Sequence, residues 1–137
     1  MQIHQSAEDY LETILMLNQR MGRVRSIDVV NELGYTKASV SIAMKKLREN
    51  GYIAVDGEGN LTLLEPGREI AERIYSRHRL LTHFFVQLGV DEEVAAEDAC
   101  KAEHILSEQT LEKIREYALL HLSLIHISEP TRHAQIS

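Results

Sequence analysis

The sequence predicts a mainly α-helical fold, in which an N-terminal winged helix-turn-helix is followed by an all-helical domain. Three amphipathic patterns of helical period, separated by glycines, lie within residues 6–50. A short β-hairpin pattern follows directly, and from residue 66 the patterns are again helical. Two short helices joined by a tight glycine-containing turn, with a hairpin after the second, are typical of a winged helix.

The first helical pattern covers residues 6–19. Its apolar side chains recur at helical spacing, and Ser6 with Asp9 resembles a capping box in which Asp takes the place of Glu. Gly22 is expected to end this helix.

The next two patterns form the predicted helix-turn-helix. Ser26 is expected to cap a helix over residues 27–33, which ends at Gly34. Thr36 is expected to cap the recognition helix over residues 37–50. The apolar positions of the recognition helix are Val40, Ile42, Met44 and Leu47.

The hairpin pattern supplies the wing. The runs YIAV (52–55) and LTLL (61–64) are of β type, and the Gly-rich segment between them is a turn signal. The first domain is therefore expected to span residues 1–65.

Three helices are predicted after the wing. Pro66 takes a favoured first-turn position of a long helix over 66–88. A second helix is expected over 91–107, and Ser107 is expected to cap the last one. Residues 66–121 are therefore predicted to form the second domain, joined rigidly to the first by the long helix.

The composition is that of an ordinary soluble globular protein, with 137 residues, 44% hydrophobic and 26% charged. No apolar run suits a membrane span or a signal peptide, and a single cysteine fits a reducing cytoplasm. The net charge of −6 is unevenly spread, because residues 20–50 carry 7 basic and 3 acidic residues whereas residues 91–121 carry 3 and 9. This asymmetry indicates an anion-binding module followed by a cation-binding one.

The predicted recognition helix has side chains that suit DNA. Its first residues are small or hydroxylated and could approach base edges in the major groove. Basic residues further along would contact phosphates, although a solvated basic helix face is the alternative. The expected DNA-binding residues are Thr36, Lys37, Ala38, Ser39, Ser41, Lys45, Lys46 and Arg48.

Side chains that bind metals fall on three of the predicted helices. Two carboxylates three residues apart share a face of the first helix, and one imidazole lies in the long helix. A thiolate, a carboxylate and an imidazole lie at i, i+3 and i+4 of the acidic helix, which also puts them on one face. Together these groups suit a divalent first-row transition metal, although each alone could be a core, solvated or dipole-compensating residue. The candidate ligands are Asp9, Glu12, His78, Cys100, Glu103 and His104.

In combination, these segments resemble the diphtheria-toxin-repressor and manganese-transport-regulator (DtxR/MntR) family of metal-dependent transcriptional repressors. The resemblance covers about residues 5–121 and rests on AEDYLETI, GYTKASVSIAMKKLRENGYI, LEPGREIAERI, RHRLL and EDACKAEHILSE, in that order. It implies a homodimer that binds inverted-repeat operator DNA, with the metal as corepressor held by the six candidate ligands. Metal that joins the first helix to the second domain would fix the spacing of the two recognition helices at about 34 Å.

The same resemblance leaves the metal open. Asp9 and Glu12 resemble the manganese-responsive branch of the family, whereas Cys100 resembles the iron-responsive branch. We favour Mn(II), with Fe(II) as the alternative. Thr82 and Ala96 stand where the iron branch has ligands of an ancillary site, so that site is expected to be absent in its iron-branch form. The residues expected at the dimer interface are Leu81, Phe84, Phe85, Leu106, Leu111, Ile114, Leu119 and Leu120.

The end of the chain is expected to be foreign. Residues 122–132, LSLIHISEPTR, resemble a translated sequencing-library adapter, so residues 122–137 are predicted to be a non-native tail. A β-branched strand with a polar tail is the alternative.

Two rival functions stay open, namely a winged-helix regulator without a metal response and a small metalloenzyme. No HExxH motif, Ser/His/Asp set or phosphate-binding loop supports catalysis, so we expect no enzyme. Neither a membrane nor a small-molecule substrate is expected as a partner.

Overall fold

The computed structural model describes the backbone of residues 5–128 and the side chains of residues 5–120. The chain divides into two compact units, the first ending at Ser76 and the second beginning at Arg77. This division lies inside the long helix, whereas the sequence placed a domain boundary at the start of that helix. The elements, in order, are α1 (Gln5–Met21), α2 (Ser26–Leu33), α3 (Lys37–Glu49), β1 (Ile53–Val55), β2 (Leu61–Leu63), α4 (Glu65–Gln87), α5 (Glu92–Ala102) and α6 (Glu108–Ser128).

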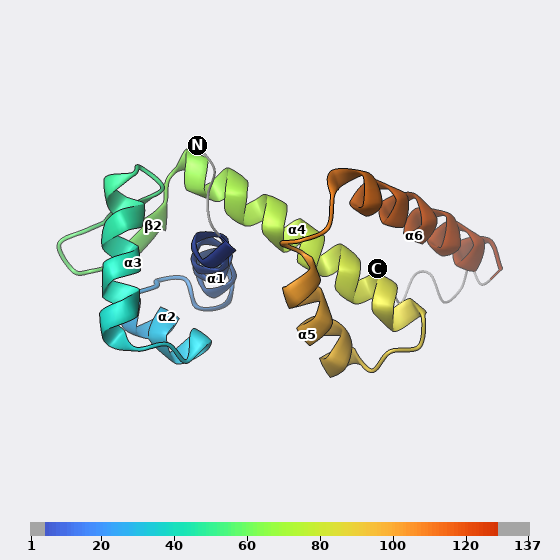
Figure 1. The fold of residues 1–137 in the computed structure, drawn as a ribbon, viewed down its shortest axis with the longest axis horizontal. Coiled ribbons are helices and arrows are strands. Elements are labelled where there is room, and N and C mark those ends of the chain that lie inside the picture. The colour runs from blue at the N-terminus through green and yellow to red at the C-terminus, as the bar shows by residue number, and fades with distance from the viewer. Residues whose placement is uncertain (1–4, 129–137) are drawn as a thin grey trace. The chain divides into compact units, whose positions relative to one another are not determined.

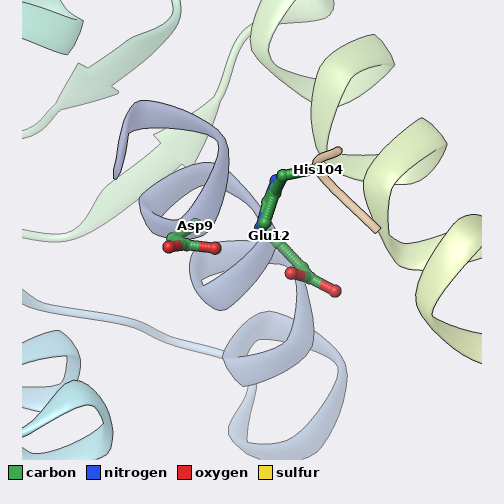
Figure 2. Close-up of side chains that lie close together, drawn as sticks. All are labelled: Asp9, Glu12 and His104. Carbon is green, nitrogen blue, oxygen red and sulfur yellow. The ribbon is translucent and has the colours of Figure 1, made fainter. Parts of the chain in front are cut away.

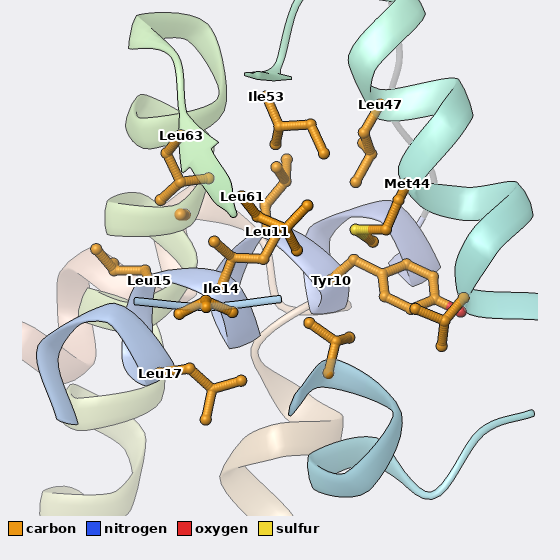
Figure 3. Packing of buried hydrophobic residues seen from close by; sticks show 14 residues of the cluster. Tyr10, Leu11, Ile14, Leu15, Leu17, Met44, Leu47, Ile53, Leu61 and Leu63 are labelled. Carbon is orange, nitrogen blue, oxygen red and sulfur yellow. The ribbon is translucent and has the colours of Figure 1, made fainter. Parts of the chain in front are cut away.

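The first unit is built around α1, whose apolar face is buried by α2, α3 and the hairpin (Figures 1 and 3). Leu11 and Ile14 of α1 are fully buried, and Met44 and Leu47 of α3 pack into the same cluster as Ile53 of β1. The mainly α-helical winged-helix arrangement predicted from the sequence is therefore confirmed.

Helix caps set the entry of the two short helices. Thr36 caps α3 as predicted, because its Oγ1 accepts a hydrogen bond from the Ser39 backbone N–H at 3.1 Å. The prediction for α2 is one residue off: the N-cap is Arg25, whose backbone N–H donates to Asp28 Oδ2 at 2.8 Å. Ser6 is not a cap either, since α1 already begins at Gln5.

The wing is a two-stranded antiparallel hairpin in which Ile53 pairs with Leu63 and Val55 with Leu61. Its turn is closed by Asp56, whose Oδ1 accepts from the backbone N–H groups of Glu58 and Asn60, each at 2.9 Å. Figure 1 shows this turn projecting past α3 on the side away from α1. The wing turn and the recognition helix α3 therefore lie on the same side of the first unit.

A glycine lets the chain pass from the wing into α4. A Cβ on Gly67 would lie only 2.2 Å from the backbone oxygen of Tyr52, far inside van der Waals contact. Gly67 is accordingly required by the close approach of two backbones rather than by a special φ angle.

The second unit has a small core made by α4, α5 and α6. Leu81, Ala99 and Leu111 are buried there, and five partly buried hydrophobic residues pack against them. The interface prediction was wrong for Leu81 and Leu111, because these leucines fill the core of their own unit instead of facing solvent.

The last helix runs through Ser128, so the alternative that residues 122–128 form a strand is wrong. The predicted tail also includes residues 129–137, which lie outside the described residues. Within the described part of the chain, no helix is long and apolar enough to cross a membrane.

Candidate functional site

Helix α1 presents the first pair of candidate metal ligands. Glu12 is only 6% exposed and Asp9 is half-buried. A carboxylate oxygen of each lies within 4.8 Å of the other, and Figure 2 shows both side chains projecting from α1. The prediction that they share a face of this helix is confirmed. A buried carboxylate beside a second one is stable only when cations or hydrogen-bond donors compensate the charge.

The second unit brings three further candidate ligands together: the buried carboxylate of Glu103 and the two imidazoles beside it. Glu103 is 0% exposed, and its Oε1 lies 3.7 Å from His78 Nδ1 and 3.8 Å from His104 Nε2. His78 comes from α4, whereas Glu103 and His104 come from the turn after α5. These distances are too long for hydrogen bonds, and among the described residues neither carboxylate oxygen of Glu103 has a hydrogen-bond partner.

The arrangement around Glu103 suits a metal ion. A fully buried carboxylate without hydrogen bonds is costly unless a cation or a proton neutralises it. Two imidazoles that flank it offer nitrogen donors, and imidazole with carboxylate suits divalent Mn, Fe or Zn. The residues present therefore fit a first-row divalent cation by burial and by donor type.

The predicted common face of Cys100, Glu103 and His104 falls at the C-terminal end of α5. Helix α5 ends at Ala102, and Glu103 is its C-cap, with right-handed helical backbone angles and an N–H that donates to the Ala99 oxygen at 2.9 Å; His104 lies in the turn that follows. Cys100 is exposed, whereas Glu103 is fully buried. Whether the thiolate binds a metal stays a prediction.

An arginine that is not among the predicted site residues holds this turn in place. Arg77 Nη1 donates to the backbone oxygen of Glu103 at 3.2 Å, and Nη2 forms an ion pair with Glu108. Arg77 is one residue before His78, and its side chain is only 15% exposed. The position of Arg77 directly before the candidate ligand His78 was the only sequence signal of its role. Its partners, Glu103 and Glu108, are distant in the chain and could not be predicted from the sequence.

The recognition helix α3 presents its predicted DNA-binding residues to solvent. All eight of these residues are exposed. The hydroxyl of Thr36 donates a hydrogen bond to Ser39 Oγ at 2.9 Å, as part of the helix cap. Of the three predicted DNA-binding residues with a hydroxyl group, Ser41 is the one outside this hydrogen-bonded pair. Basic side chains gather toward the end of the helix, where they would reach a phosphate backbone.

One apolar residue of α3 faces solvent instead of the core. Ile42 is 58% exposed, unlike the other apolar positions of the helix. Val40, Met44 and Leu47 are buried, and Ile42 lies on the opposite, solvent-facing side with Ala38 one turn before it. Helical spacing from Ala38 was the signal that could have identified it.

The wing turn is acidic. Hydrogen bonds from the backbone and side chain of Asn60 hold the pKa of Asp56 below its ordinary value, so this carboxyl is ionised at neutral pH. Glu58 adds a second carboxylate to the turn. Arg23 and Arg25 border the same turn, in a cleft of about 400 Å³ that Asp28 also lines.

Helices α4 and α6 form an open groove on the second unit, lined by apolar and polar side chains. Its volume is about 420 Å³, and its lining includes Phe84, Ile114 and Tyr117. The rings of Phe84 and Tyr117 meet edge to face, with centroids 6.0 Å apart. Leu119 and Leu120 are exposed further along α6.

Comparison with known proteins identifies both halves of the chain. Residues 2–61 match the iron dependent repressor, N-terminal DNA binding domain, and residues 64–119 match the iron dependent repressor, metal binding and dimerisation domain. These families, like the relatives below, are transcriptional regulators and not enzymes.

The curated relatives are similar over most of their length. An uncharacterised HTH-type transcriptional regulator of Methanocaldococcus jannaschii is 36% identical over 113 residues, which are 81% of this chain and 90% of the relative. The HTH-type transcriptional regulator MntR of Bacillus subtilis is 35% identical over 109 residues, which are 80% of this chain and 77% of the relative.

A solved structure has the same fold. The manganese-dependent transcriptional repressor in complex with manganese aligns with a TM-score of 0.75 at 28% identity, over 82% of this chain and 52% of the solved one. The chain thus spans about half the length of that solved protein. With both family matches and relatives above 30% identity, the chain belongs to the iron-dependent repressor family, the DtxR/MntR group of metal-dependent transcriptional regulators.

Proposed function

We propose that this protein is a cytoplasmic repressor that binds inverted-repeat operator DNA as a homodimer when it is loaded with Mn(II), with Fe(II) as the alternative metal. The observation that carries the proposal is the buried Glu103 carboxylate between two imidazoles. Its compensation by a divalent cation would link metal binding to the structure of the second unit. The exposed, partly basic recognition helix supports the DNA-binding half of the proposal.

The proposed ligand set joins both groups of donors. The family to which the chain belongs, and the resemblance of all six candidate positions to its metal ligands, support one cation for both groups of donors. We therefore propose that both groups serve the same cation. A divalent ion shared in this way would favour one arrangement of the dimer over the others, and it would shift the population only to the extent that it binds that arrangement more tightly.

Manganese is favoured because oxygen donors outnumber soft ones. Asp9, Glu12 and Glu103 supply carboxylates, which suit Mn(II), whereas the only thiolate in the sequence belongs to the exposed Cys100. Cys100 remains in the proposed set. Cys100→Ser tests its membership directly, because loss of a ligand would lower metal affinity, whereas loss of an exposed non-ligand thiol would leave that affinity unchanged.

A second copy of this chain is the proposed occupant of the groove on the second unit. The family match to a dimerisation domain over residues 64–119 and the exposed Leu119 and Leu120 support this assignment. Sedimentation at micromolar concentration tests it, with Leu119→Lys combined with Leu120→Lys as the disrupting variant. A wild-type chain that sediments as a monomer would contradict the proposal.

The decisive experiment is a selection from a random DNA duplex library, run anaerobically with Mn(II), with Fe(II) and with chelator. An inverted-repeat motif recovered only with a metal is expected, and the more effective metal names the corepressor. Recovery of the same motif in chelator would point instead to a winged-helix regulator without a metal response. Failure to enrich any motif would contradict DNA binding itself.

Variants of the candidate ligands separate metal binding from folding. Glu103→Ala combined with His104→Ala is expected to remove the metal dependence of DNA affinity while the circular dichroism spectrum stays helical. The matched control is Glu97→Ala, because Glu97 is an exposed acidic residue of the neighbouring α5. Metal dependence that survives in the double variant would reject the ligand assignment.

A further inference from the structure

An exposed isoleucine stands among the charged and polar residues of the recognition helix. Ile42 is 58% exposed in α3, with its core-facing neighbours Val40 and Met44 buried. The buried cluster of the first unit does not include it. The exposed side chain of Ile42 therefore does not gain the stabilisation that burial gives the other apolar side chains of α3.

The neighbours of Ile42 on the helix face suit DNA. Ala38 lies one turn before it, and Lys45 and Lys46 lie one turn after it, all exposed. The basic residues would contact phosphates on either side of a groove, which aims the apolar pair at the base edges between them. Charge complementarity thus selects the DNA major groove as the occupant of this face.

We infer that Ile42 is a specificity-determining residue that contacts the 5-methyl group of a thymine in the operator; the inference rests on the proposed function. Isoleucine has no hydrogen-bond donor or acceptor, so it cannot read the polar pattern of a base pair. The thymine methyl is the one apolar group that a base presents in the major groove. Contact with it would remove the exposed side chain from water at the moment of binding.

The test removes that methyl group alone. Each thymine of the selected operator is replaced in turn by deoxyuridine, which keeps every hydrogen-bonding group and lacks only the 5-methyl. In the presence of Mn(II), wild-type affinity is expected to fall about fourfold at one thymine of each half-site, the factor that corresponds to burial of one methyl-sized group.

Variants of Ile42 test whether this side chain is the one that contacts the methyl group. Ile42→Ala is expected to bind thymine and deoxyuridine duplexes equally at that position, whereas Ile42→Val keeps most of the discrimination. Ile42→Gln is expected to change the preferred base at that position from thymine to adenine, because Gln pairs with adenine N6 and N7. The matched control is Ile27→Ala, since Ile27 is an exposed isoleucine of α2, outside α3.

The outcomes separate the inference from the function on which it rests. Metal-dependent operator binding with no deoxyuridine effect, or with the same effect in Ile42→Ala, overturns the role of Ile42 and leaves the repressor proposal intact. Absence of any bound motif overturns both. An effect that Ile27→Ala also abolishes would likewise overturn the assignment to Ile42.

Discussion

Arg77 donates a hydrogen bond to the backbone oxygen of Glu103 at 3.2 Å, across 26 residues of sequence. The second end of the same guanidinium pairs with Glu108 at the start of α6. Arg77 therefore ties α4 to the turn that carries Glu103 and His104. The positive charge this places near a candidate cation site is balanced by Glu108.

Replacing Arg77 should weaken metal binding although Arg77 is no ligand. In Arg77→Met, the turn loses a charged hydrogen-bond donor, and Mn(II) affinity measured by calorimetry is expected to fall about tenfold, as for other outer-shell partners. The free energy of unfolding of the metal-free protein should fall by about 1.5–3 kcal/mol.

Arg115→Met is the control for this prediction, because Arg115 pairs with Glu112 on an exposed stretch of α6. Such a surface pair contributes about 0.5 kcal/mol or less. An Arg77→Met protein with wild-type Mn(II) affinity would show that the turn is positioned without this arginine.

Glu103→Gln should make the free energy of unfolding nearly independent of Mn(II). The amide is an uncharged isostere of the carboxyl group and needs no compensating cation, so the metal-free variant is expected to be at least as stable as wild type. Wild type should gain about 2.7 kcal/mol when Mn(II) is present at one hundred times its dissociation constant, and the variant should gain far less. Thermal unfolding with and without Mn(II) measures both effects.

Glu97→Gln serves as the neutralising control, since Glu97 is exposed on α5. It is expected to behave like wild type in both conditions. A Glu103→Gln protein that keeps the full Mn(II) stabilisation would remove the central support for the metal centre.

Gly67→Ala should destabilise the first unit. The added methyl would meet the Tyr52 backbone oxygen at 2.2 Å, and relieving such overpacking costs about 1–3 kcal/mol, even though alanine is the better helix former. Gly57→Ala is the control, because a Cβ there meets nothing within 4 Å. Chemical denaturation of both variants checks the difference, and equal stabilities would contradict the close approach of the Tyr52 backbone, just before β1, to the start of α4.

Asp56 should make the wing sensitive to acid. The backbone and side chain of Asn60 lower the pKa of Asp56 below its ordinary 3.8, so this carboxyl contributes stability above pH 3.8 that is lost as the pH falls through its folded-state pKa. Asp56→Ala is therefore expected to be less stable than wild type at pH 7, with the difference shrinking below pH 3.8. Denaturation curves from pH 7 to pH 2.5 would show this, and a difference that is constant with pH would contradict it.

The sequence by itself determined the order and type of the elements. Caps such as Thr36 and glycines such as Gly34 act on their immediate neighbours, and apolar periodicity reports the local helix. Local rules also placed Asp9 and Glu12 on one face of α1. Both lie well inside the helix, where the spacing of side chains is fixed by the backbone.

Tertiary structure alone decided which side of an element faces solvent and where a helix gives way to a turn. Ile42 and Met44 look alike in sequence, yet only Met44 meets the core. Helix α5 ends with Glu103 as its C-cap, and Arg77 of a distant helix holds the turn that follows. Contacts between residues far apart in the chain set these features, and such contacts leave no periodic signal in the sequence.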